Sequence, residues 1–318
     1  MMSNKLVSVI VPVYKASKYI ERCAETLLAQ TYGEIEYYFV NDCTPDDSIE
    51  ILNRVVSKYP ERKVRIINLE KNMGHAHARN LALNICQGEY VIQIDADDWV
   101  EKNMIEKMLD SAIENDSDIV CSEFVWEKNN TVEYCHVNES DIYRDGLLNC
   151  KWTLEYSAHW NKLIRTSLIK DNGIYCIEGT NNWVDVGQVA RLRFMANKIS
   201  VVHEAMYHYN ANNENSVSRH ISDKRLNDMI FVAKTVSDFI ESHTNGEYET
   251  SIGYLKFLAI APMLATQRNE YQRWLETFPE SKKHIMKYPL RTGSRILYWL
   301  AAHGIYLPLR IMKQLKGS

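Results

Sequence analysis

Three aspartates stand within four residues of one another, directly after an apolar segment. The run D-A-D-D at 95–98 follows the strand expected over 90–94. Side chains two residues apart on an extended segment point to the same side, so Asp95 and Asp97 can face one point. Clustered carboxylates repel each other unless a cation or a proton joins them, and hard oxygen ligands favour Mg²⁺ or Mn²⁺. The run therefore indicates a metal site, with an acidic loop that caps the next helix, near Glu101, as the alternative.

A basic residue lies where it could meet a phosphate. Arg79 falls in the amino-terminal half of a helix expected over 75–85, and Gly74 before it permits an unusual backbone angle. A phosphate there would meet both a guanidinium and the positive end of the helix dipole. A surface arginine paired to a carboxylate of the acidic run is the alternative. His75 and His77 diverge on the helix and cannot chelate one ion together, so we expect them to make polar or structural contacts.

Alternating strands and helices would position these residues. Over the first 125 residues, apolar runs predict strands at 6–11, 36–40, 64–69, 90–94 and 118–124, with helical periodicity between them. Such alternation predicts a doubly wound α/β sheet with helices on both faces and ligands at the carboxyl ends of the strands. Asp42, directly after the second strand, then joins the acidic run at one edge. A turn-forming role is the alternative for Asp42.

The pattern becomes irregular after Trp126. Strands are expected near 131–137, 160–164 and 199–209, and a helix over 184–196. From Ser222 onward the chain reads as helical. We therefore expect a mixed sheet followed by a helical C-terminal extension.

Composition excludes several classes of protein. The 318 residues are 46% hydrophobic and 25% charged with a formal net charge of −4, which argues against a disordered chain and gives no reason to expect nucleic acid as a partner. Seven scattered cysteines without a C-x-x-C pair predict reduced thiols in a cytoplasmic protein. No apolar run reaches the roughly 18–20 residues of a spanning helix.

Four ordered motifs carry a resemblance to a known family. They are V-S-V-I-V-P-V-Y at 7–14, V-N-D-C-T-P-D-D-S at 40–48, N-M-G-H-A-H-A-R-N at 72–80 and I-D-A-D-D at 94–98. Together they resemble glycosyltransferase family 2, whose members have the Rossmann-like GT-A fold. The resemblance is strong over about residues 5–125 and weaker through 160–163 and 207–218. It implies sugar transfer from a nucleotide-sugar donor, a UDP-sugar by our expectation, with Mn²⁺ or Mg²⁺ at the D-x-D motif.

The resemblance also implies roles for individual residues. Asp97 would bind the metal, Asp95 the ribose, and Asp42 the base or ribose, while Arg79 would lie near the base or phosphate. The residues expected to border the base are Pro12, Val13 and Tyr14. This sequence departs from the family pattern at three positions, where Lys15 replaces an asparagine, Asn41 an aspartate and Cys43 a glycine. These departures bear on the identity of the nucleotide and leave the metal motif intact.

An inverting transferase needs a base that removes the proton of the acceptor hydroxyl. Family members often use an acid of a short E-D pair, and the corresponding stretch here is W-V-D at 183–185, with Val184 in the Glu position. Asp185 is therefore the expected base. Glu178, on the loop over 173–179, is the second candidate, and an Asp185 that only interacts with the helix dipole is the alternative. His203 and His208 are expected to be partly buried, with a metal contact as the less favoured reading.

The C-terminal segment has its own charge. Residues 280–318 carry +7, because one acid, Glu280, faces eight cations: Lys282, Lys283, Lys287, Arg291, Arg295, Arg310, Lys313 and Lys316. The segment also holds the apolar stretches 296–302 and 305–309, too short to span a bilayer. An interfacial helix on an anionic membrane is one interpretation. Removal of 281–318 would then leave a folded body; a terminal helix packed on that body is the alternative.

We thus expect a GT-A domain over 1–220, with a nucleotide-binding half (1–125) and an acceptor half (126–220), and a helical region over 221–318 with a basic tail. The acceptor would be a glycan or a lipid-linked saccharide, and the protein cytoplasmic, with peripheral contact to the inner face of the membrane left open. A non-catalytic nucleotide-sugar binding protein is the alternative, since Val184 replaces the Glu. A dehydrogenase is excluded because no G-x-G-x-x-G follows the first strand.

Overall fold

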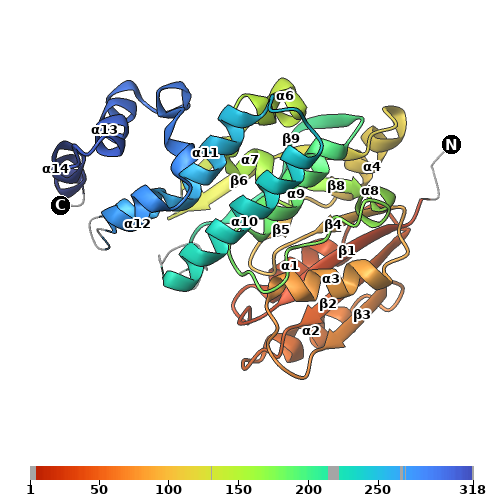
Figure 1. Cartoon of the computed structure of the whole chain (residues 1–318). Coiled ribbons are helices and arrows are strands. Elements are labelled where there is room, and N and C mark those ends of the chain that lie inside the picture. Colours follow the sequence, from red (N-terminus) through yellow and green to blue (C-terminus); the bar gives the residue numbers. More distant parts are fainter. Residues whose placement is uncertain (1–4, 130, 214–221, 266–267, 269, 317–318) are drawn as a thin grey trace.

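The structure is a computed structural model, and it describes residues 5–129, 131–213, 222–265, 268 and 270–316. Figure 1 shows the chain coloured along its sequence. Strands and helices alternate through the first part, as expected from the apolar runs. The elements are β1 (Val7–Val13), α1 (Ile20–Leu28), β2 (Ile35–Asn41), α2 (Ser48–Val56), β3 (Lys63–Asn68), α3 (His75–Ile85) and β4 (Tyr90–Gln93).

The middle of the chain adds five strands and several short helices. These elements are β5 (Trp99–Val100), α4 (Met104–Glu114), β6 (Ile119–Lys128), β7 (Thr131–Cys135), α5 (Glu139–Ile142), α6 (Arg144–Leu148), α7 (Leu154–Ser157), β8 (Lys162–Arg165), α8 (Thr166–Lys170), α9 (Val184–Met195) and β9 (Ile199–Asn210). The two-residue strand β5 and the short helices α5 to α8 have too few residues to show a period, so the sequence did not indicate them.

One mixed sheet joins the two parts. The strand order is β3-β2-β1-β4-β8-β6-β9-β5, with β7 paired to β6. Strands β1 to β4 are parallel to their neighbours among themselves, whereas β8 is antiparallel to both β4 and β6. The carboxyl ends of β1, β2 and β4 therefore lie at one edge, and β5 pairs with the end of β9 beside them. The expected doubly wound mixed sheet is confirmed.

Apolar clusters cover both faces of the sheet. One packs α1, α2 and α4 against β1 and β2, and another packs α3, α8 and α9 against the opposite face. Helix α9 takes part in two clusters: Leu192 faces the sheet, while Val186, Ala190 and Phe194 face the C-terminal helices. Because α9 is apolar on two sides, it connects the sheet to the helical region.

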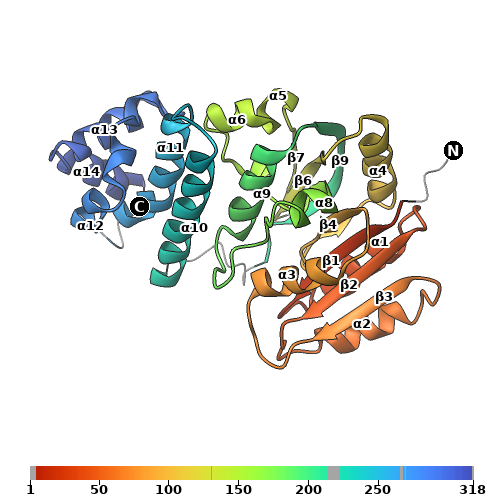
Figure 2. The same ribbon diagram turned by 45° about the vertical axis from the view of Figure 1, so that its right-hand side comes forward.

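Helices make up the remaining described chain. They are α10 (Asp223–Ser242), α11 (Glu249–Ile260), η1 (Ala261–Leu264), α12 (Tyr271–Glu276), η2 (Pro279–Lys282), η3 (Ile285–Lys287), α13 (Thr292–Ala302) and α14 (Leu307–Lys316). Figures 1 and 2 show them gathered at the end of the molecule opposite to β1–β3. Among the described residues, no helix combines the length and apolar character needed to cross a bilayer.

The basic tail is part of the helical core. Ile285, Tyr288, Ala301 and Leu309 are all at most 1% exposed and pack with α10 and α11. Removing 281–318 would take these buried side chains out of the cluster, so the expectation of a separable tail is wrong. Short apolar stretches do not show in the sequence which of their residues face a neighbouring helix, and that is decided by packing.

Candidate active site

The acidic run lies in a loop that two strands hold in place. Strand β4 ends just before Asp95, and β5 begins at Trp99 and pairs with β9. Asp98 is 2% exposed and accepts hydrogen bonds from the Tyr207 hydroxyl (2.5 Å) and the Asn210 N–H (2.7 Å). Asp98 therefore fixes the loop to β9, while Asp95 and Asp97 are half-buried. The segment is a turn, closed by the Asp98 N–H on the Asp95 carbonyl (3.2 Å), so the expected extended backbone is absent and a common direction of the Asp95 and Asp97 side chains stays a prediction.

The neighbours of Asp97 in the loop change its acidity. Burial, and then the charge of Asp95, raise the pKa of Asp97 to about 6. Its Oδ2 accepts a hydrogen bond from the Asn213 amide (2.7 Å), which opposes the rise. Neighbouring carboxylates in a partly dry site favour a proton or a cation between them. Cation binding by this pair stays a prediction.

Arg79 is buried against the acidic loop and is not a surface residue. It is 3% exposed, and its Nη2 donates to Asp95 Oδ1. Its Nε and Nη1 are also buried and have no hydrogen-bond partner among the residues that the structure describes. A buried donor without a partner costs about 1–3 kcal/mol, and an anion at this place would remove that cost. The pairing of Arg79 with a carboxylate of the acidic run agrees with one of the two sequence readings, and the phosphate contact stays a prediction.

Asp42 holds the loop in front of α3. Its carboxylate, 2% exposed, accepts hydrogen bonds from the backbone N–H of Met73 (2.6 Å) and of Gly74 (2.9 Å). Asn72 donates to the carbonyl of Asp42 (3.2 Å). The end of β2 and the start of α3 are therefore tied together, and Asp42 has a positioning role that the sequence reading did not foresee.

Gly74 allows the loop before α9 to approach α3. It has φ +87°, and a Cβ there would lie 2.5 Å from Asn181 Oδ1. The carbonyl of Asn181 accepts a hydrogen bond from His75 Nε2 (3.2 Å). Burial and the charge of Arg79 lower the pKa of His75 to about 3, so this histidine is neutral. The expected structural contacts of His75 are confirmed.

Asn80 makes a second connection between α3 and that loop. Its amide donates to the carbonyl of Cys176 and accepts from the Cys176 N–H, both at 2.9 Å. This pair mimics a backbone ladder between segments 96 residues apart. Together with Gly74, it brings the start of α9 to the same sheet edge as the acidic loop.

Asp185 stands in the first turn of α9, after Trp183, which adopts a left-handed backbone with φ +59°. Burial raises the pKa of Asp185, and the hydrogen bond that the Val186 N–H donates to it (2.8 Å) opposes this rise. The negative charge of Asp95 raises the pKa of Asp185 further, whereas the positive charge of Arg79 lowers it. Residues far apart in the sequence therefore act on one carboxylate. The fold brings Asp185 within electrostatic reach of the acidic loop.

Glu178 has a different environment. Its side chain is 55% exposed and contacts His77 Nδ1 and the Asn80 amide, each at 3.2 Å. Burial alone would raise the pKa of Glu178, but the hydrogen bonds from His77 and Asn80 lower it. A carboxylate with a lowered pKa is a weaker base, so the electrostatics favour Asp185 over Glu178 for proton removal.

The residues expected at the base differ in exposure. Tyr14 is 44% exposed at the end of β1, and Pro12 is half-buried. Val13 is fully buried in the core, and its carbonyl accepts the Asp42 N–H (3.0 Å). A ligand at this edge would meet the ring of Tyr14, whereas the side chain of Val13 supports the core.

Two departures from the family pattern fall at left-handed backbone positions. Lys15 has φ +51° and Cys43 has φ +55°. Asparagine and glycine, the residues that the resemblance places there, adopt this region at lower cost than other residues. Lys15 and Cys43 therefore place side chains with a Cβ at two strained backbone positions.

The histidines of β9 contact glutamate side chains. His203 Nδ1 contacts Glu123 (3.1 Å), and His208 contacts Glu127 (2.8 Å) and Glu101 (2.9 Å). In the described part of the chain, no three His, Cys, Asp or Glu side chains group closely enough to hold a metal ion by themselves. His208 is half-buried as expected, whereas the side chain of His203 is 60% exposed on the outer part of β9, so the expectation of a partly buried His203 is wrong.

Sequence reasoning missed the contribution of β9 to the site. Tyr209 stacks on Trp126 with ring centroids 4.6 Å apart. Burial, and then the charges of the three aspartates of the acidic loop and of Asp185, raise the pKa of Tyr209. The site therefore has a phenol group beside an aromatic face. The Y-H-Y-N run at 207–210, next to an irregular region, was the only signal.

Comparisons with known proteins agree with this geometry. The family model for glycosyl transferase family 2 matches residues 8–173, just over half of the chain. GlyG of Streptococcus pneumoniae serotype 4, a glycosyltransferase, is 28% identical over 65% of this chain and 71% of its own. The uncharacterized glycosyltransferase YibD of Escherichia coli K12 is 31% identical over 68% of this chain and 64% of its own.

A solved structure extends the likeness to the whole fold. The Staphylococcus aureus TarS fragment 1–349, crystallised with UDP-GlcNAc, has a TM-score of 0.72 and 23% identity, covering 97% of this chain and 90% of that one. The fold is thus the GT-A type of sugar-transferring enzymes. The chain belongs to glycosyl transferase family 2 and is a glycosyltransferase.

Proposed function

We propose that the protein transfers a sugar from a UDP-sugar to a glycan or lipid-linked saccharide, with inversion at the sugar and with a divalent cation. The observation that carries the proposal is the convergence of the acidic loop, the unpartnered donors of Arg79 and the half-buried Asp185 at one sheet edge. The UDP-GlcNAc in the TarS structure supports the donor class, because that protein shares the fold.

The residues present fit a divalent cation. The raised pKa of Asp97 reflects the repulsion between two nearby carboxylates as well as burial, and a cation relieves such repulsion. Asp97 would hold Mn²⁺ or Mg²⁺, with further ligands from the donor diphosphate and water. When bound, the ion would supply positive charge that stabilises the departing diphosphate.

The donor would be held by side chains from three strand ends. Arg79 would give its two unpartnered N–H groups to the diphosphate, and Asp95, oriented by Arg79, would accept from the ribose. Tyr14 would cover the base, with Pro12 and Val13 beneath it. Asp42 would contact the base or ribose, and it would also position the loop before α3 by accepting its backbone N–H groups.

Asp185 would act as the base. The acceptor oxygen attacks the anomeric carbon, the bond from that carbon to the diphosphate oxygen breaks, and Asp185 receives the hydroxyl proton. Its raised pKa makes it a stronger base than an ordinary aspartate. Attack from the face opposite to the leaving group inverts the configuration of the sugar.

We also propose a division of labour along the chain. Residues 1–125 would bind the donor and 126–220 the acceptor, with Tyr209 and Trp126 on the acceptor side, while 221–318 form the helical region. Aromatic faces suit the apolar faces of sugar rings, which supports the placement of Tyr209 and Trp126.

Calorimetry with Mn²⁺ and UDP-GlcNAc tests the metal assignment. Asp97→Ala should remove most activity and the metal-dependent part of donor binding while the fold stays intact. Asp110→Ala removes an exposed carboxylate on α4 and serves as the matched control. Unchanged metal-dependent affinity in the Asp97 variant would falsify the assignment. Donor binding without transfer or hydrolysis under any metal would instead favour a non-catalytic binding protein.

A further inference from the structure

The last two helices have one packed and one open side. Ala301 of α13 and Leu309 of α14 are fully buried, and Tyr298 and Met312 pack against the same cluster. The helix pair therefore has a defined position on α11 and α12. Its outer side has no covering element among the residues that the structure describes.

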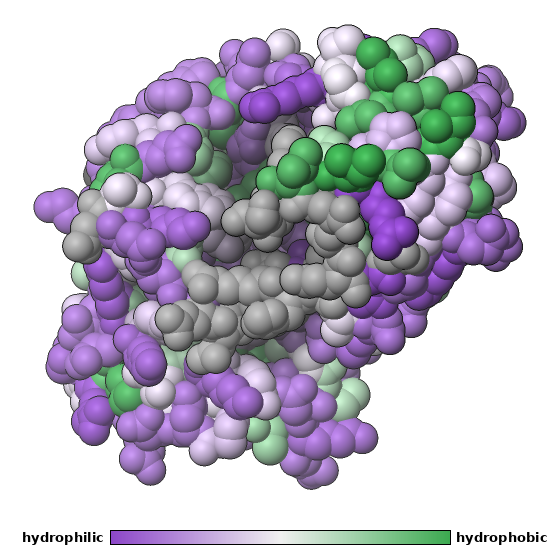
Figure 3. Space-filling view, turned by 90° about the vertical axis from the view of Figure 1, so that its left-hand side faces the viewer, coloured by the Kyte–Doolittle hydropathy of each residue, from purple (hydrophilic) through white to green (hydrophobic). Residues whose placement is uncertain are grey.

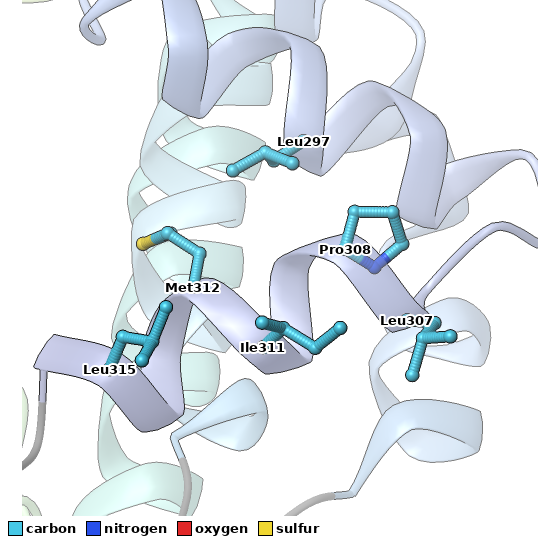
Figure 4. Close-up of a pocket in the computed structure, with 6 residues that line it drawn as sticks. All are labelled: Leu297, Leu307, Pro308, Ile311, Met312 and Leu315. Carbon is cyan, nitrogen blue, oxygen red and sulfur yellow. The ribbon is translucent and has the colours of Figure 1, made fainter.

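The open side of α14 is apolar along its length. Leu307, Ile311 and Leu315, spaced at i, i+4 and i+8, are 65%, 47% and 74% exposed. Figure 4 shows these side chains in a groove of about 630 Å³ between α13 and α14, lined by Leu297, Leu307, Pro308, Ile311, Met312 and Leu315. These three side chains form an apolar stripe on one face of α14. Such a stripe favours a binding partner, because water solvates apolar surface poorly.

Helix α13 and the turn after it expose further apolar side chains. Ile296 and Trp299 are 45% and 41% exposed, and Ile305 is 52% exposed. Figure 3, which faces the side of the molecule where α13 and α14 lie, shows a hydrophobic area in its upper part. We call Ile296, Trp299, Ile305, Leu307, Ile311 and Leu315 the apolar face.

The charge around the apolar face has one sign. Residues 281–318 contain no Asp or Glu, and Lys287, Arg291 and Arg310 are exposed. Burial lowers the pKa of Lys313, which lies over the Tyr298 ring, to about 8. The segment that carries the apolar face thus also carries exposed cations, and it has no acid to neutralise them.

We propose that the apolar face binds an anionic lipid surface, with α14 lying in the plane of the interface and the surrounding cations contacting the headgroups. Apolar side chains on one face and cations around them are the pattern of interfacial helices. A second copy of the chain fits less well, because a two-fold contact would place two cationic segments against each other. The inference rests on the proposed function in one respect: contact with the lipid surface would bring the active site to a lipid-linked acceptor.

Co-sedimentation of the full chain with vesicles tests the proposal. We expect binding to phosphatidylcholine vesicles that contain phosphatidylglycerol, and little binding to phosphatidylcholine alone. The affinity of the triple variant Leu307→Gln, Ile311→Gln, Leu315→Gln for these vesicles should be lower by about tenfold or more. Its matched control, Val132→Gln, Tyr134→Gln, Phe231→Gln, removes three apolar side chains of 53–65% exposure from other elements and should bind as the parent does.

A second pair of variants tests the charges. Lys287→Gln, Arg291→Gln, Arg310→Gln should weaken binding about tenfold at low salt, and the loss should shrink as salt rises, because screening shortens the reach of the charges. The control Arg54→Gln, Lys102→Gln, Lys128→Gln removes three exposed cations from the sheet domain and should leave binding unchanged.

Three results would overturn the proposal. They are no binding to anionic vesicles, equal loss in the matched control variants, or a concentration-dependent dimer that the Leu307/Ile311/Leu315 variant abolishes while vesicle binding is absent. Melting curves and calorimetry with UDP show whether each variant is folded and binds nucleotide. Since the vesicle assay needs no sugar transfer, its failure can be told apart from a failure of the proposed enzyme activity.

Discussion

Replacing Asp42 by asparagine separates two roles that this residue could have. In the structure its two carboxylate oxygens accept the backbone N–H groups of Met73 (2.6 Å) and Gly74 (2.9 Å). The resemblance to the family implies a contact with the nucleotide instead. The Asp42→Asn variant would keep the shape of the side chain but place an NH₂ group against one of the two N–H donors.

The structure sets the size of the effect. One charge-assisted hydrogen bond to the side chain of Asp42, which is 2% exposed, is lost, and the backbone N–H of Met73 or Gly74 is left opposite a donor. Hydrogen bonds to charged groups contribute about 1.5–3 kcal/mol, so we expect Asp42→Asn to lower the free energy of unfolding by about 2–3 kcal/mol. Because the loop before α3 also positions Arg79, UDP affinity should fall as a consequence.

Urea denaturation gives the stability, and calorimetry with UDP gives the affinity. Asp47→Asn, an exposed aspartate of the same loop, is the matched control and should change both by little. The reasoning is refuted if Asp42→Asn unfolds at the same urea concentration as the parent while UDP affinity falls, since that result describes a direct ligand contact without a positioning role.

Three further outcomes follow from the site and its backbone. Cys43→Gly should raise the free energy of unfolding, measured in urea, by about 0.5–1 kcal/mol. A left-handed backbone costs a non-glycine residue about 1–2 kcal/mol, and the greater freedom of glycine in the unfolded chain offsets part of the gain from removing that strain. A loss of stability would contradict the strain argument. Asp185→Asn should lower turnover roughly 10²-fold or more with UDP affinity within a few-fold. Since the base must be ionised and its pKa is raised, the parent's rate should climb with pH through a pKa above that of an ordinary aspartate, and this limb should vanish in the variant. Normal turnover in Asp185→Asn, with loss in Glu178→Gln, would assign the base to Glu178. Tyr209→Phe should leave stability and UDP binding unchanged and raise the KM for the acceptor; an altered UDP affinity would place the hydroxyl on the donor side.

Much of the fold could be predicted from local patterns. Helix α3 occupies the residues expected for it, 75–85, and the strands of the first half lie close to the expected ranges, with the largest differences at their ends. Parallel strands buried on both faces need unbroken apolar runs, and the helices between them need a repeating apolar stripe. Both requirements act over a few residues, so they are visible along the sequence.

The acidic run was also visible, because Asp95 and Asp97 are close neighbours in the chain; metal binding there stays a prediction. Only the tertiary structure decided that Arg79 pairs with Asp95 and that Asp42 accepts a hydrogen bond from a loop 31 residues away. It also decided that the charges of Asp95 and Arg79 act on the pKa of Asp185. These contacts depend on sheet order and on a glycine that lets two loops meet. Neither the sheet order nor the approach of the two loops can be predicted from the spacing of residues along the chain.

The C-terminal segment shows the same division most clearly. Its sequence determined a cationic, partly apolar chain with no acid after Glu280. Packing decided that Ala301 and Leu309 are buried while Leu307 and Ile311 stay exposed. Composition records how much apolar surface a helix has, but only its neighbours determine which side of it water can reach.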